Sequence, residues 1–433
     1  MIEDKNIFLN KKILIYGLGK TGLSAFNFLK NKSKVFLFDD LKKKKINLSI
    51  KKKLISINQI YQLKFDKIIL SPGIDLNRCK LSKFLKKNLK IIYSDLDVFY
   101  AFNKNDCITI TGTNGKSTTC KLINDILLSQ KHDVRLVGNI GNPILSARNI
   151  KRKTIFVIEA SSYQLEYSKI FRSKYSVILN LSPDHIERHK TLNKYIKAKF
   201  KLLKNQLKTH TAFVKRNDSL ISKELSSNKF NCKIIKVDTQ IVSNLKNKIN
   251  NQYFLNETNK ENLSFALTIS KKLRINFNSI IKPIQNFRGL NYRQQIILKR
   301  KKLTIINDSK STSFSSSIGL LKIDSNILWI LGGIYKKGDK FNLSKKYYPN
   351  IRAFIFGNSK KFFNQRLAGK INYQNFKTLH EAVRKVLIIV KQEKFVKKTI
   401  LFSPSAASFD SFKNFEERGK YFNKLIKKNF NGL

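Results

Sequence analysis

The stretch "ITGTNGKSTT" at residues 110–119 constrains the fold more than any other part of the chain. It follows the apolar segment "DCITI" (106–110) and precedes a segment whose apolar residues recur at helical spacing from Leu122 to Leu127. A glycine loop between a strand and a helix can bind phosphate, because glycine lets backbone N–H groups approach the anion and a helix N-terminus favours negative charge. We therefore predict an α/β fold with a nucleotide loop.

This loop is shorter than the usual pattern. Two residues separate Gly112 from Gly115, where the common phosphate loop has four. The remaining residues fit the chemistry, because Lys116 can neutralise the β- and γ-phosphates and the Ser117 or Thr118 hydroxyl can hold Mg²⁺ at the start of the helix. The predicted ATP loop comprises Gly112, Thr113, Asn114, Gly115, Lys116, Ser117 and Thr118.

Strand and helix signals alternate along the 433 residues in three series. Alternation of this kind is typical of parallel sheets covered by helices, and the chain is too long for one core. We predict three tandem α/β domains over 1–94, 95–289 and 290–433. The expected strands lie at 12–17, 34–40, 66–73, 106–110, 154–159, 175–180, 303–308, 326–333, 351–358 and 398–404, and the clearest helix of the third series lies at 380–393.

The first glycine turn along the chain, with Gly17, Gly19 and Gly22, follows the first expected strand and opens a helix. Asp39 ends the next strand about twenty residues later, as in dinucleotide-binding folds. NAD, FAD and a nucleotide-sugar diphosphate are all compatible with this turn, and so is a purely structural role.

Two further polar groups stand at ends of expected strands in the middle series. Glu159 ends an almost wholly apolar strand, where a carboxylate beside a phosphate loop can bind Mg²⁺. The segment "NLSPDHIERH" (180–189) gathers the side chains that could ligate a metal or phosphate, namely Asn180, Asp184, His185, Glu187 and His189. A solvated edge residue and a capped loop are the structural alternatives for these two features.

The composition is that of a globular protein despite a formal net charge of +58. The lysines are spread along the whole chain, and the block Lys42–Lys45 has the pattern of a solvated loop, so we expect no specific nucleic-acid partner. Cys79, Cys107, Cys120 and Cys232 are scattered, which favours a reducing cytoplasm. Since no apolar run is long enough to span a bilayer, no membrane insertion is expected.

Taken together, these motifs resemble the Mur ligase family over essentially the whole chain. The resemblance rests on "GLGKTGLS", "SPGI", "TGTNGKST", "VGNIGNP", "EASSYQLE", "NLSPDHIERH", "FRGLNYR", "INDSKSTS" and "LSPSAASFDSFKNFEERG", which occur in the family's order. The short loop is the normal ATP loop of that family. The resemblance implies a Rossmann-like N-terminal domain that binds the UDP substrate, a central P-loop-type ATPase domain, and a Rossmann-like C-terminal domain that binds the amino acid.

The resemblance also implies an activity. The chain would add D-glutamate to UDP-N-acetylmuramoyl-L-alanine (UDP-MurNAc-L-Ala) through an acyl phosphate, releasing ADP and phosphate during synthesis of the peptidoglycan precursor. ATP and two Mg²⁺ ions would be the cofactors. The enzyme would be a cytoplasmic monomer, and its partners would be these small-molecule substrates.

Site residues follow from the resemblance position by position. Lys116, His185, Lys199 and Lys310 would be catalytic. The metal ligands would be Ser117, Glu159, His185 and Lys199, the last as a carbamylated lysine. Asn262, Arg293 and Asp308 would join the loop in binding ATP. The UDP substrate would be held by Gly19, Lys20, Thr21, Ser71, Gly73, Asn139 and His185. D-glutamate would contact Thr312, Lys336, Ser408 and Phe415 beside Lys310.

The chain departs from the family pattern at three places. Thr258-Asn259 stands where a His-Asn pair is expected, and Tyr292-Arg293 where His-Arg is expected. The stretch after Gly333 reads "IYKKGDKF" in place of a glycine-rich segment, so the match at Lys336 is looser. The alternatives are an amide ligase with another acceptor or amino acid, a nicotinamide oxidoreductase suggested by the first glycine turn alone, and a nucleic-acid-binding protein suggested by the charge.

Overall fold

The computed structural model of the chain describes residues 6–41, 47–243, 249, 251–254, 256–322 and 326–430. The basic block Lys42–Lys45 lies outside the described residues. The chain divides into two compact units, the first of residues 1–250 and 261–285 and the second of residues 251–260 and 286–433. In the described part, no helix has both the length and the apolar character needed to cross a membrane.

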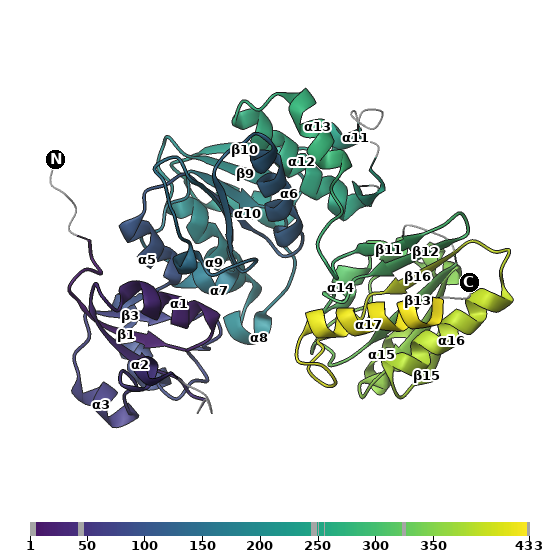
Figure 1. Cartoon of the computed structure of the whole chain (residues 1–433), viewed down its shortest axis with the longest axis horizontal. Helices are drawn as coiled ribbons and strands as arrows, with labels where there is room; N and C mark the ends of the chain where they lie inside the picture. Colours follow the sequence, from purple (N-terminus) through teal and green to yellow (C-terminus); the bar gives the residue numbers. More distant parts are fainter. Residues whose placement is uncertain are drawn as a thin grey trace. The chain divides into compact units, whose positions relative to one another are not determined.

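A four-stranded parallel sheet begins the first unit, with the strand order β2-β1-β3-β4 (Figure 1). Its strands are β1 (Lys12–Tyr16), β2 (Lys34–Phe38), β3 (Lys67–Leu70) and β4 (Ile92–Tyr93). The accompanying helices are α1 (Lys20–Leu29), α2 (Leu48–Lys51), α3 (Ile57–Gln62), α4 (Ser82–Lys87) and α5 (Asp95–Phe102). The three strands expected from the sequence in this region are confirmed.

A six-stranded parallel sheet forms the rest of the first unit, in the order β10-β9-β8-β5-β7-β6. Its strands are β5 (Cys107–Thr111), β6 (Val134–Gly138), β7 (Ile155–Glu159), β8 (Tyr175–Ile178), β9 (Thr211–Lys215) and β10 (Lys233–Val237). Its helices are α6 (Lys116–Ser129), α7 (Ser162–Glu166), α8 (Ile186–His189), α9 (Leu192–Lys204), α10 (Ser219–Ser227), α11 (Gln240–Ser243), α12 (Glu257–Lys272) and α13 (Phe277–Gln285), and residues 257–260 of α12 are assigned to the second unit.

The two sheets of the first unit share one hydrophobic cluster. Phe99 of α5 packs edge-on against Phe156 of β7, with ring centroids 4.7 Å apart. Because such packing removes apolar surface of both sheets from water, it holds the first sheet against the middle one.

The second unit contains a mixed six-stranded sheet, in the order β11-β12-β16-β13-β14-β15. Only the pair β11 and β12 is antiparallel among the strand pairs described there. The strands are β11 (Gln295–Lys299), β12 (Leu303–Asn307), β13 (Ile327–Gly332), β14 (Ile351–Phe356), β15 (Asn372–Phe376) and β16 (Lys398–Phe402). The helices are α14 (Phe314–Ser317), α15 (Lys360–Leu367), α16 (Leu379–Gln392) and α17 (Phe415–Phe430).

Both faces of this sheet are buried. Alternate residues of β13 face opposite sides, so Leu328 packs in one cluster with α16 and α17 while Trp329 packs in another with α15. A strand covered on both faces must be apolar throughout, which is why the run 326–333 is recognisable in the sequence. Short 3-10 helices cover Leu89–Ile91, Ile144–Ser146, Gln252–Phe254, Leu320–Lys322 and Lys345–Asn350.

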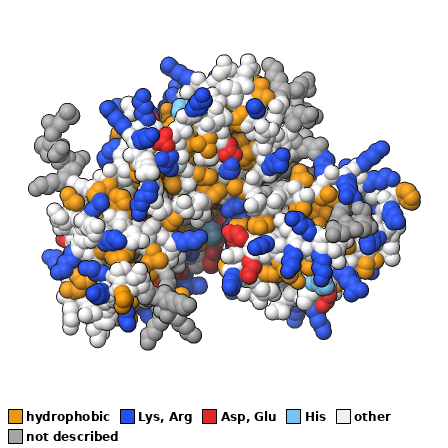
Figure 2. Space-filling model, in the orientation of Figure 1, with side chains coloured by type: hydrophobic (Ala, Val, Ile, Leu, Met, Phe, Trp, Pro, Cys, Tyr) orange, Lys and Arg blue, Asp and Glu red, His pale blue; other side chains and the backbone are white. Residues whose placement is uncertain are grey.

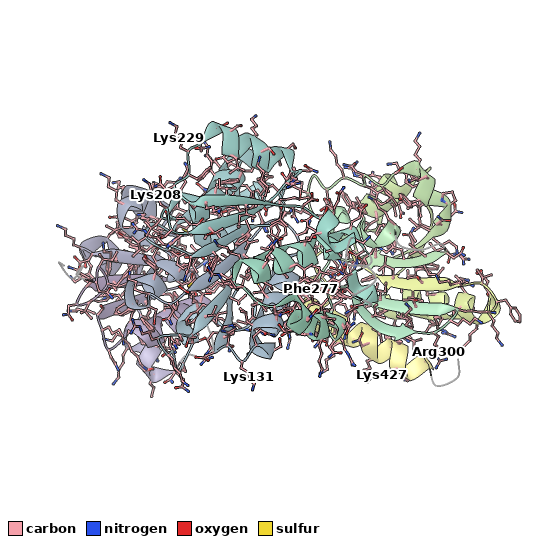
Figure 3. All side chains as sticks on the ribbon, turned by 90° about the horizontal axis from the view of Figure 1, so that it is seen from above. Lys131, Lys208, Lys229, Phe277, Arg300 and Lys427 are labelled. Atoms are coloured by element: carbon pink, nitrogen blue, oxygen red, sulfur yellow. The ribbon has the colours of Figure 1, made fainter. Side chains whose placement is uncertain are left out.

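The expected fold class of tandem α/β sheets is confirmed, with one sheet inside each predicted range. The boundaries after residues 94 and 289 stay a prediction. The positive charge is dispersed, as expected. Figure 2 shows Lys and Arg side chains scattered over the visible face, and the exposed Lys131, Lys208, Lys229 and Lys427 project at separate places in Figure 3.

Candidate active site

The predicted ATP loop joins β5 to α6 at the centre of the middle sheet. The chain runs from β5 toward β6 on one side and from β8 toward β9 on the other, so the crevice between β5 and β8 is the point where strand order reverses. Ligands of open α/β sheets bind at such points, beyond the carboxyl ends of the strands. The loop 112–115 and the segment after β8 both lie there.

Both glycines of the loop adopt conformations that side chains disfavour. Gly112 has φ +145° and Gly115, the N-cap of α6, has φ +85°. A Cβ atom on Gly115 would lie 2.1 Å from Oδ1 of Asn262, and one on Gly112 would lie 3.0 Å from Cβ of Leu179. The tight packing on both sides explains why this short loop needs glycine at each end.

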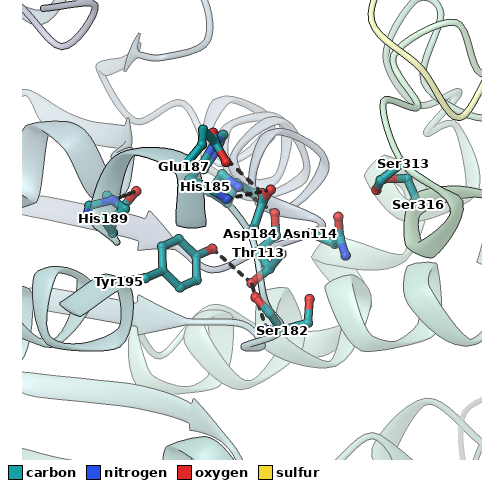
Figure 4. Close-up of polar contacts among 12 residues, drawn as sticks. Thr113, Asn114, Ser182, Asp184, His185, Glu187, His189, Tyr195, Ser313 and Ser316 are labelled. Atoms are coloured by element: carbon teal, nitrogen blue, oxygen red, sulfur yellow. Dashed lines mark hydrogen bonds and ion pairs between the residues drawn. The ribbon is translucent and has the colours of Figure 1, made fainter. Parts of the chain in front are cut away.

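The segment after β8 fastens the loop. The Thr113 N–H donates to the Asn180 carbonyl (2.9 Å), and the Asn114 N–H donates to Oδ1 of Asn180 (2.9 Å). Oγ1 of Thr113 accepts from the Ser182 N–H (3.0 Å) and lies 3.0 Å from the Tyr195 hydroxyl (Figure 4). Asn180 therefore serves the loop rather than a ligand set with His185.

A buried carboxylate lies beside the first turn of α6. Ser117 Oγ donates to Oε2 of Glu159 (2.5 Å), and Nδ2 of Asn139 donates to Oε1 (3.0 Å). Glu159 is 2% exposed at the end of β7. The expected proximity of Glu159 to the phosphate loop is therefore present, and the cluster offers the hard oxygen donors that Mg²⁺ prefers.

Two lysines approach the loop from different sides. Nζ of Lys116 donates to the carbonyls of Gly112 (2.9 Å) and Thr113 (2.7 Å). Nζ of Lys199, on α9, donates to the same Gly112 carbonyl (2.8 Å) and lies 4.6 Å from the centroid of the Tyr195 ring. Burial, reinforced by repulsion from Lys116, lowers the pKa of Lys199 well below its usual value. Burial thus makes the neutral amine of Lys199 easier to form than that of an exposed lysine.

The two histidines of "NLSPDHIERH" occupy different environments. His185 is partly exposed at the N-terminus of α8, where it forms ion-pair contacts with Asp184 (3.4 Å) and Glu187 (3.6 Å) (Figure 4). His189 is buried, with Nε2 3.0 Å from Oγ of Ser162, and burial lowers its pKa to about 4. The two histidines therefore lie in different surroundings, and a ligand role for either stays a prediction.

No group of three or more His, Cys, Asp or Glu side chains converges as a metal site within the described residues. The metal ligands expected from the sequence include only two such residues, Glu159 and His185, besides Ser117 and Lys199. Their roles as ligands stay a prediction.

The first glycine turn is also tightly built. A Cβ on Gly22 would lie 1.9 Å from the Gly17 carbonyl oxygen, whereas Gly19 has open space around it. Ser71 Oγ donates to that carbonyl (2.6 Å), and Oδ2 of Asp39 accepts from the N–H of Leu18 (2.5 Å). The turn leaves Lys20 and Thr21 at the start of α1, and the exposed Gly73 follows β3 nearby. Asn139 lies instead with Glu159.

In the second unit, several predicted residues lie near the carboxyl end of β12. Nζ of Lys310 lies 4.2 Å from the centroid of the Phe415 ring, and the Arg293 guanidinium lies 5.7 Å from it. Asp308 is buried and accepts from Ser403 Oγ (2.8 Å) and the Gln294 N–H (3.1 Å). Burial raises its pKa to about 7.

The remaining predicted contacts of the second unit lie on adjacent loops. Thr312 is exposed two residues after Lys310, and Ser408 is buried in the turn after β16. Lys336 lies in the loop after β13, where its carbonyl accepts from the N–H of Asp339 (3.1 Å).

Thr258 and Tyr292, which replace family histidines, and Asn259 beside Thr258 also have defined neighbours. Asn259 donates through Nδ2 to Oε1 of Gln294 (2.9 Å), and a Cβ on Gly319 would lie 3.2 Å from Oγ1 of Thr258. Tyr292 packs on Gly419, where an added Cβ would lie 2.4 Å from the ring. Each replacement is accommodated by local packing.

Sequence reasoning missed three residues that support these sites. Tyr195 contacts Thr113, Arg188 donates to the Pro72 carbonyl (2.5 Å), and Arg418 is buried beneath the loop of Lys310. Tyr195 lies four residues before Lys199, one helical turn away, which was the one signal available for it.

A phosphate-type loop with an adjacent buried carboxylate, both at strand ends of the second of three α/β sheets along the chain, defines a nucleotide-dependent enzyme. Residues 110–280 match the family model described as Mur ligase middle domain, and residues 11–93 match the Mur ligase MurD-like, N-terminal domain. The chain belongs to the Mur ligase family.

Curated relatives match nearly the full length. A UDP-N-acetylmuramoylalanine--D-glutamate ligase of Rickettsia prowazekii is 34% identical over 98% of this chain and 100% of the relative. One of Buchnera aphidicola subsp. Schizaphis graminum is also 34% identical, over 97% of this chain and 98% of the relative. Among solved structures, MurF of Thermotoga maritima in complex with ADP has a TM-score of 0.57, with 14% identity over 98% of this chain and 99% of that one. MurC of Thermotoga maritima has a TM-score of 0.55, with 16% identity over 97% of this chain and 100% of that one.

Proposed function

We propose that this chain is an ATP-dependent ligase that joins D-glutamate to UDP-MurNAc-L-Ala, with release of ADP and phosphate, in synthesis of the peptidoglycan precursor. The observation that carries the proposal is the near full-length similarity to relatives of that name. The glycine loop beside Glu159 supports the ATP half of the reaction. We expect the enzyme to act as a monomer in the cytoplasm.

The chemistry requires activation of a carboxylate, because a carboxylate is a poor electrophile toward an amine. An oxygen of the L-alanine carboxylate attacks the γ-phosphorus of ATP, and ADP leaves with the electrons of the broken P–O bond. The D-glutamate amine then attacks the acyl phosphate, and phosphate leaves from the tetrahedral intermediate as the amine loses a proton. Lys116 stands where its ammonium can offset the charge of the transferred phosphoryl group.

The Glu159 cluster fits Mg²⁺, since it combines a carboxylate, the Ser117 hydroxyl and the Asn139 amide. Bound Mg²⁺ would supply charge neutralisation for the phosphates during transfer. We propose that Ser117 and Glu159 hold one ion, and that His185 and a carbamylated Lys199 hold a second. ATP would also contact Asn262, Arg293 and Asp308.

Burial of Lys199 against the loop supports its carbamylation, because a neutral amine has the lone pair needed to attack CO₂. The new N–C bond forms as one N–H proton leaves to solvent, and the product is an anion able to bind Mg²⁺. Protein equilibrated with isotope-labelled bicarbonate should show a carbamate carbon signal by NMR. The same signal in the Lys199→Ala variant would contradict the assignment.

The substrate contacts follow the family pattern. The UDP moiety would lie at the turn of Gly19, Lys20 and Thr21, opposite Ser71 and Gly73, and Asn139 and His185 would contact the sugar-peptide part. In the second unit, Lys310 carries a cation suited to a substrate carboxylate. Thr312, Lys336, Ser408 and Phe415 would complete the site for D-glutamate.

The proposed function is tested by phosphate release. The protein is supplied with UDP-MurNAc-L-Ala, Mg-ATP and one amino acid at a time, and phosphate is measured. Release with D-glutamate only is expected. Release with L-lysine in place of D-glutamate would identify a different ligase, and no release with any amino acid would overturn the proposal.

A matched pair of variants links that activity to the loop. Lys116→Ala should abolish release because it removes the ammonium that lies over the loop. Lys121→Ala removes a lysine of the same helix whose ion pair is with Asp125, on the exposed side. It should keep release within about twofold of the unaltered enzyme, since surface ion pairs contribute little.

A further inference from the structure

Arg418 on α17 is a charged side chain enclosed almost completely by protein. It is 1% exposed and is the second largest of the fully buried side chains described. A buried charge is retained only where hydrogen bonds replace its water. Because the guanidinium has no access to solvent, it cannot touch a substrate, and any part it plays must pass through its neighbours.

The guanidinium ties together three separate segments through their backbones. Nη2 donates to the carbonyls of Ser309 (2.7 Å) and Ala406 (2.9 Å), and Nη1 makes a longer bond to the carbonyl of Gly332 (3.5 Å). Nε also donates to Oγ of Ser309 (3.1 Å). Arginine suits this position because its planar fork carries five donors, whereas a lysine ammonium is a single point.

Each tied segment leads directly into a predicted contact of the amino acid. Ser309 precedes Lys310, Ala406 stands two residues before Ser408, and Gly332, the last residue of β13, precedes the loop that carries Lys336. The three residues lie at or just after the ends of β12, β13 and β16, and only tertiary contacts can hold these strand ends in register.

Two further contacts surround the Arg418 guanidinium and Ser309. Oγ of Ser309 donates to the Phe415 carbonyl (2.9 Å), so the start of α17 is joined to the segment that the guanidinium holds. Gly333 has φ +125°, and a Cβ there would lie 3.0 Å from Nη1 of Arg418 and 2.3 Å from the Ala407 carbonyl oxygen. The glycine leaves room for the guanidinium.

We propose that Arg418 is the positioning residue of the amino-acid site, which fixes the loops of Lys310, Lys336 and Ser408 and so sets the affinity for the incoming amino acid. The kinetic part of this inference rests on the proposed function. The structural part, that the guanidinium immobilises these loops, does not.

The test uses the full chain with Arg418→Lys and Arg418→Met. Hydrogen–deuterium exchange should be at least tenfold faster in segments 309–312, 333–338 and 405–410 of both variants, with β13 and β14 unchanged. In the phosphate-release assay, the KM for D-glutamate should rise at least tenfold, while the KM values for ATP and UDP-MurNAc-L-Ala change less than twofold. Arg384→Met, at an exposed position of α16, is the matched control and should leave every value unchanged.

Ser309→Ala is the substitute variant if the Arg418 variants do not fold. It removes only the Ser309 hydroxyl, which accepts from Nε of Arg418 and donates to the Phe415 carbonyl. It should raise the KM for D-glutamate about threefold and speed exchange in 309–312. Unchanged exchange in these segments, or KM values for all three substrates that rise together, would overturn the inference. If the unaltered enzyme is inactive with D-glutamate, the proposed function is refuted. The hydrogen–deuterium exchange result would then decide by itself whether Arg418 immobilises these loops.

Discussion

The replacement Asp308→Asn should make the second unit more stable while it weakens the enzyme. Asp308 is enclosed by protein, and burial raises the pKa of its carboxyl from 3.8 to about 7. The cations that act on it, Arg293 and Arg418, offset only part of that effect. Above pH 7 the Asp308 carboxyl of the folded protein is therefore ionised although it is buried, which lowers the free energy of unfolding.

The magnitude follows from proton linkage. Between pH 4 and 7 the folded state binds a proton that the unfolded state has released, so stability falls as pH rises through this window. The shift of about 3 pKa units corresponds to about 4 kcal/mol at pH 8, about 2 kcal/mol at pH 5.5 and under about 1 kcal/mol at pH 4. An asparagine does not titrate, so the variant should not lose stability through this group as the pH rises.

Asparagine can keep the hydrogen bonds. Its Oδ1 can accept from the Gln294 N–H, and its amide N–H can donate to Ser403 Oγ. The Ser403 hydroxyl can then donate to Ser317 Oγ, 2.6 Å away. No buried polar group need be left without a partner, so the replacement itself should cost little.

Urea unfolding measured by tryptophan fluorescence isolates the effect. Trp329 is the only tryptophan of the chain and is buried in the same unit, with Nε1 donating to the Ser403 carbonyl (2.8 Å). At pH 8 the Asp308→Asn midpoint should lie about 2 M urea above that of the unaltered protein, for a slope of about 2 kcal/mol per M. At pH 4 the two midpoints should nearly coincide.

Glu416→Gln, at an exposed position of α17, is the control, and its midpoint should stay close to that of the unaltered protein because exposed substitutions change stability little. A difference between Asp308→Asn and the unaltered protein that does not grow from pH 5 to 8 would refute the linkage argument. Phosphate release by Asp308→Asn should fall at least tenfold at pH 8, if the carboxylate contacts ATP as proposed.

Three other substitutions test local packing and charge. Gly115→Ala should lower phosphate release at least tenfold at saturating ATP, since its Cβ would lie 2.1 Å from Oδ1 of Asn262; turnover at the unaltered rate would contradict this. Gly22→Ala should cost about 1–3 kcal/mol, seen as a lower melting temperature by far-UV circular dichroism, because its Cβ would lie 1.9 Å from a backbone oxygen. Glu393→Gln should cost about 1 kcal/mol at pH 7 by Trp329 fluorescence, a value kept small because the carboxylate is partly exposed. Because ion pairing lowers the pKa of Glu393 to about 2, its contribution should be complete above pH 4.5 and fade toward pH 2.

Most of the central strands were predictable because their burial leaves a plain trace in the sequence, although the buried central strand β9 was missed. Strands such as β7 and β13 are almost wholly buried and read as continuous apolar runs that end in glycine or a polar residue. The strand β15 was missed because "NYQNF" lies at an edge with much of its surface exposed. Edge strands need few apolar residues, so periodicity does not reveal them.

The site was predictable to the extent that it is local in sequence. The ATP loop is contiguous, and the proximity of Glu159 follows from its place at the end of a neighbouring parallel strand. The burial of Lys199 is set by the packing of α9, which nothing in a lysine-rich sequence reveals. Arg418 was overlooked for the same reason, since its partners are backbone carbonyls from three distant segments.

The second unit is discontinuous in the chain, because residues 251–260 belong to it together with 286–433. Tyr253 packs edge-on against Phe287 with ring centroids 5.3 Å apart, and Asn259 bonds Gln294. A fragment cut at the predicted boundary of 290 would lose these partners, so a stable fragment should begin at 251. During synthesis, residues 251–260 leave the ribosome before the sheet they belong to exists, so they can pack against that unit only after residues 286 onward have been made.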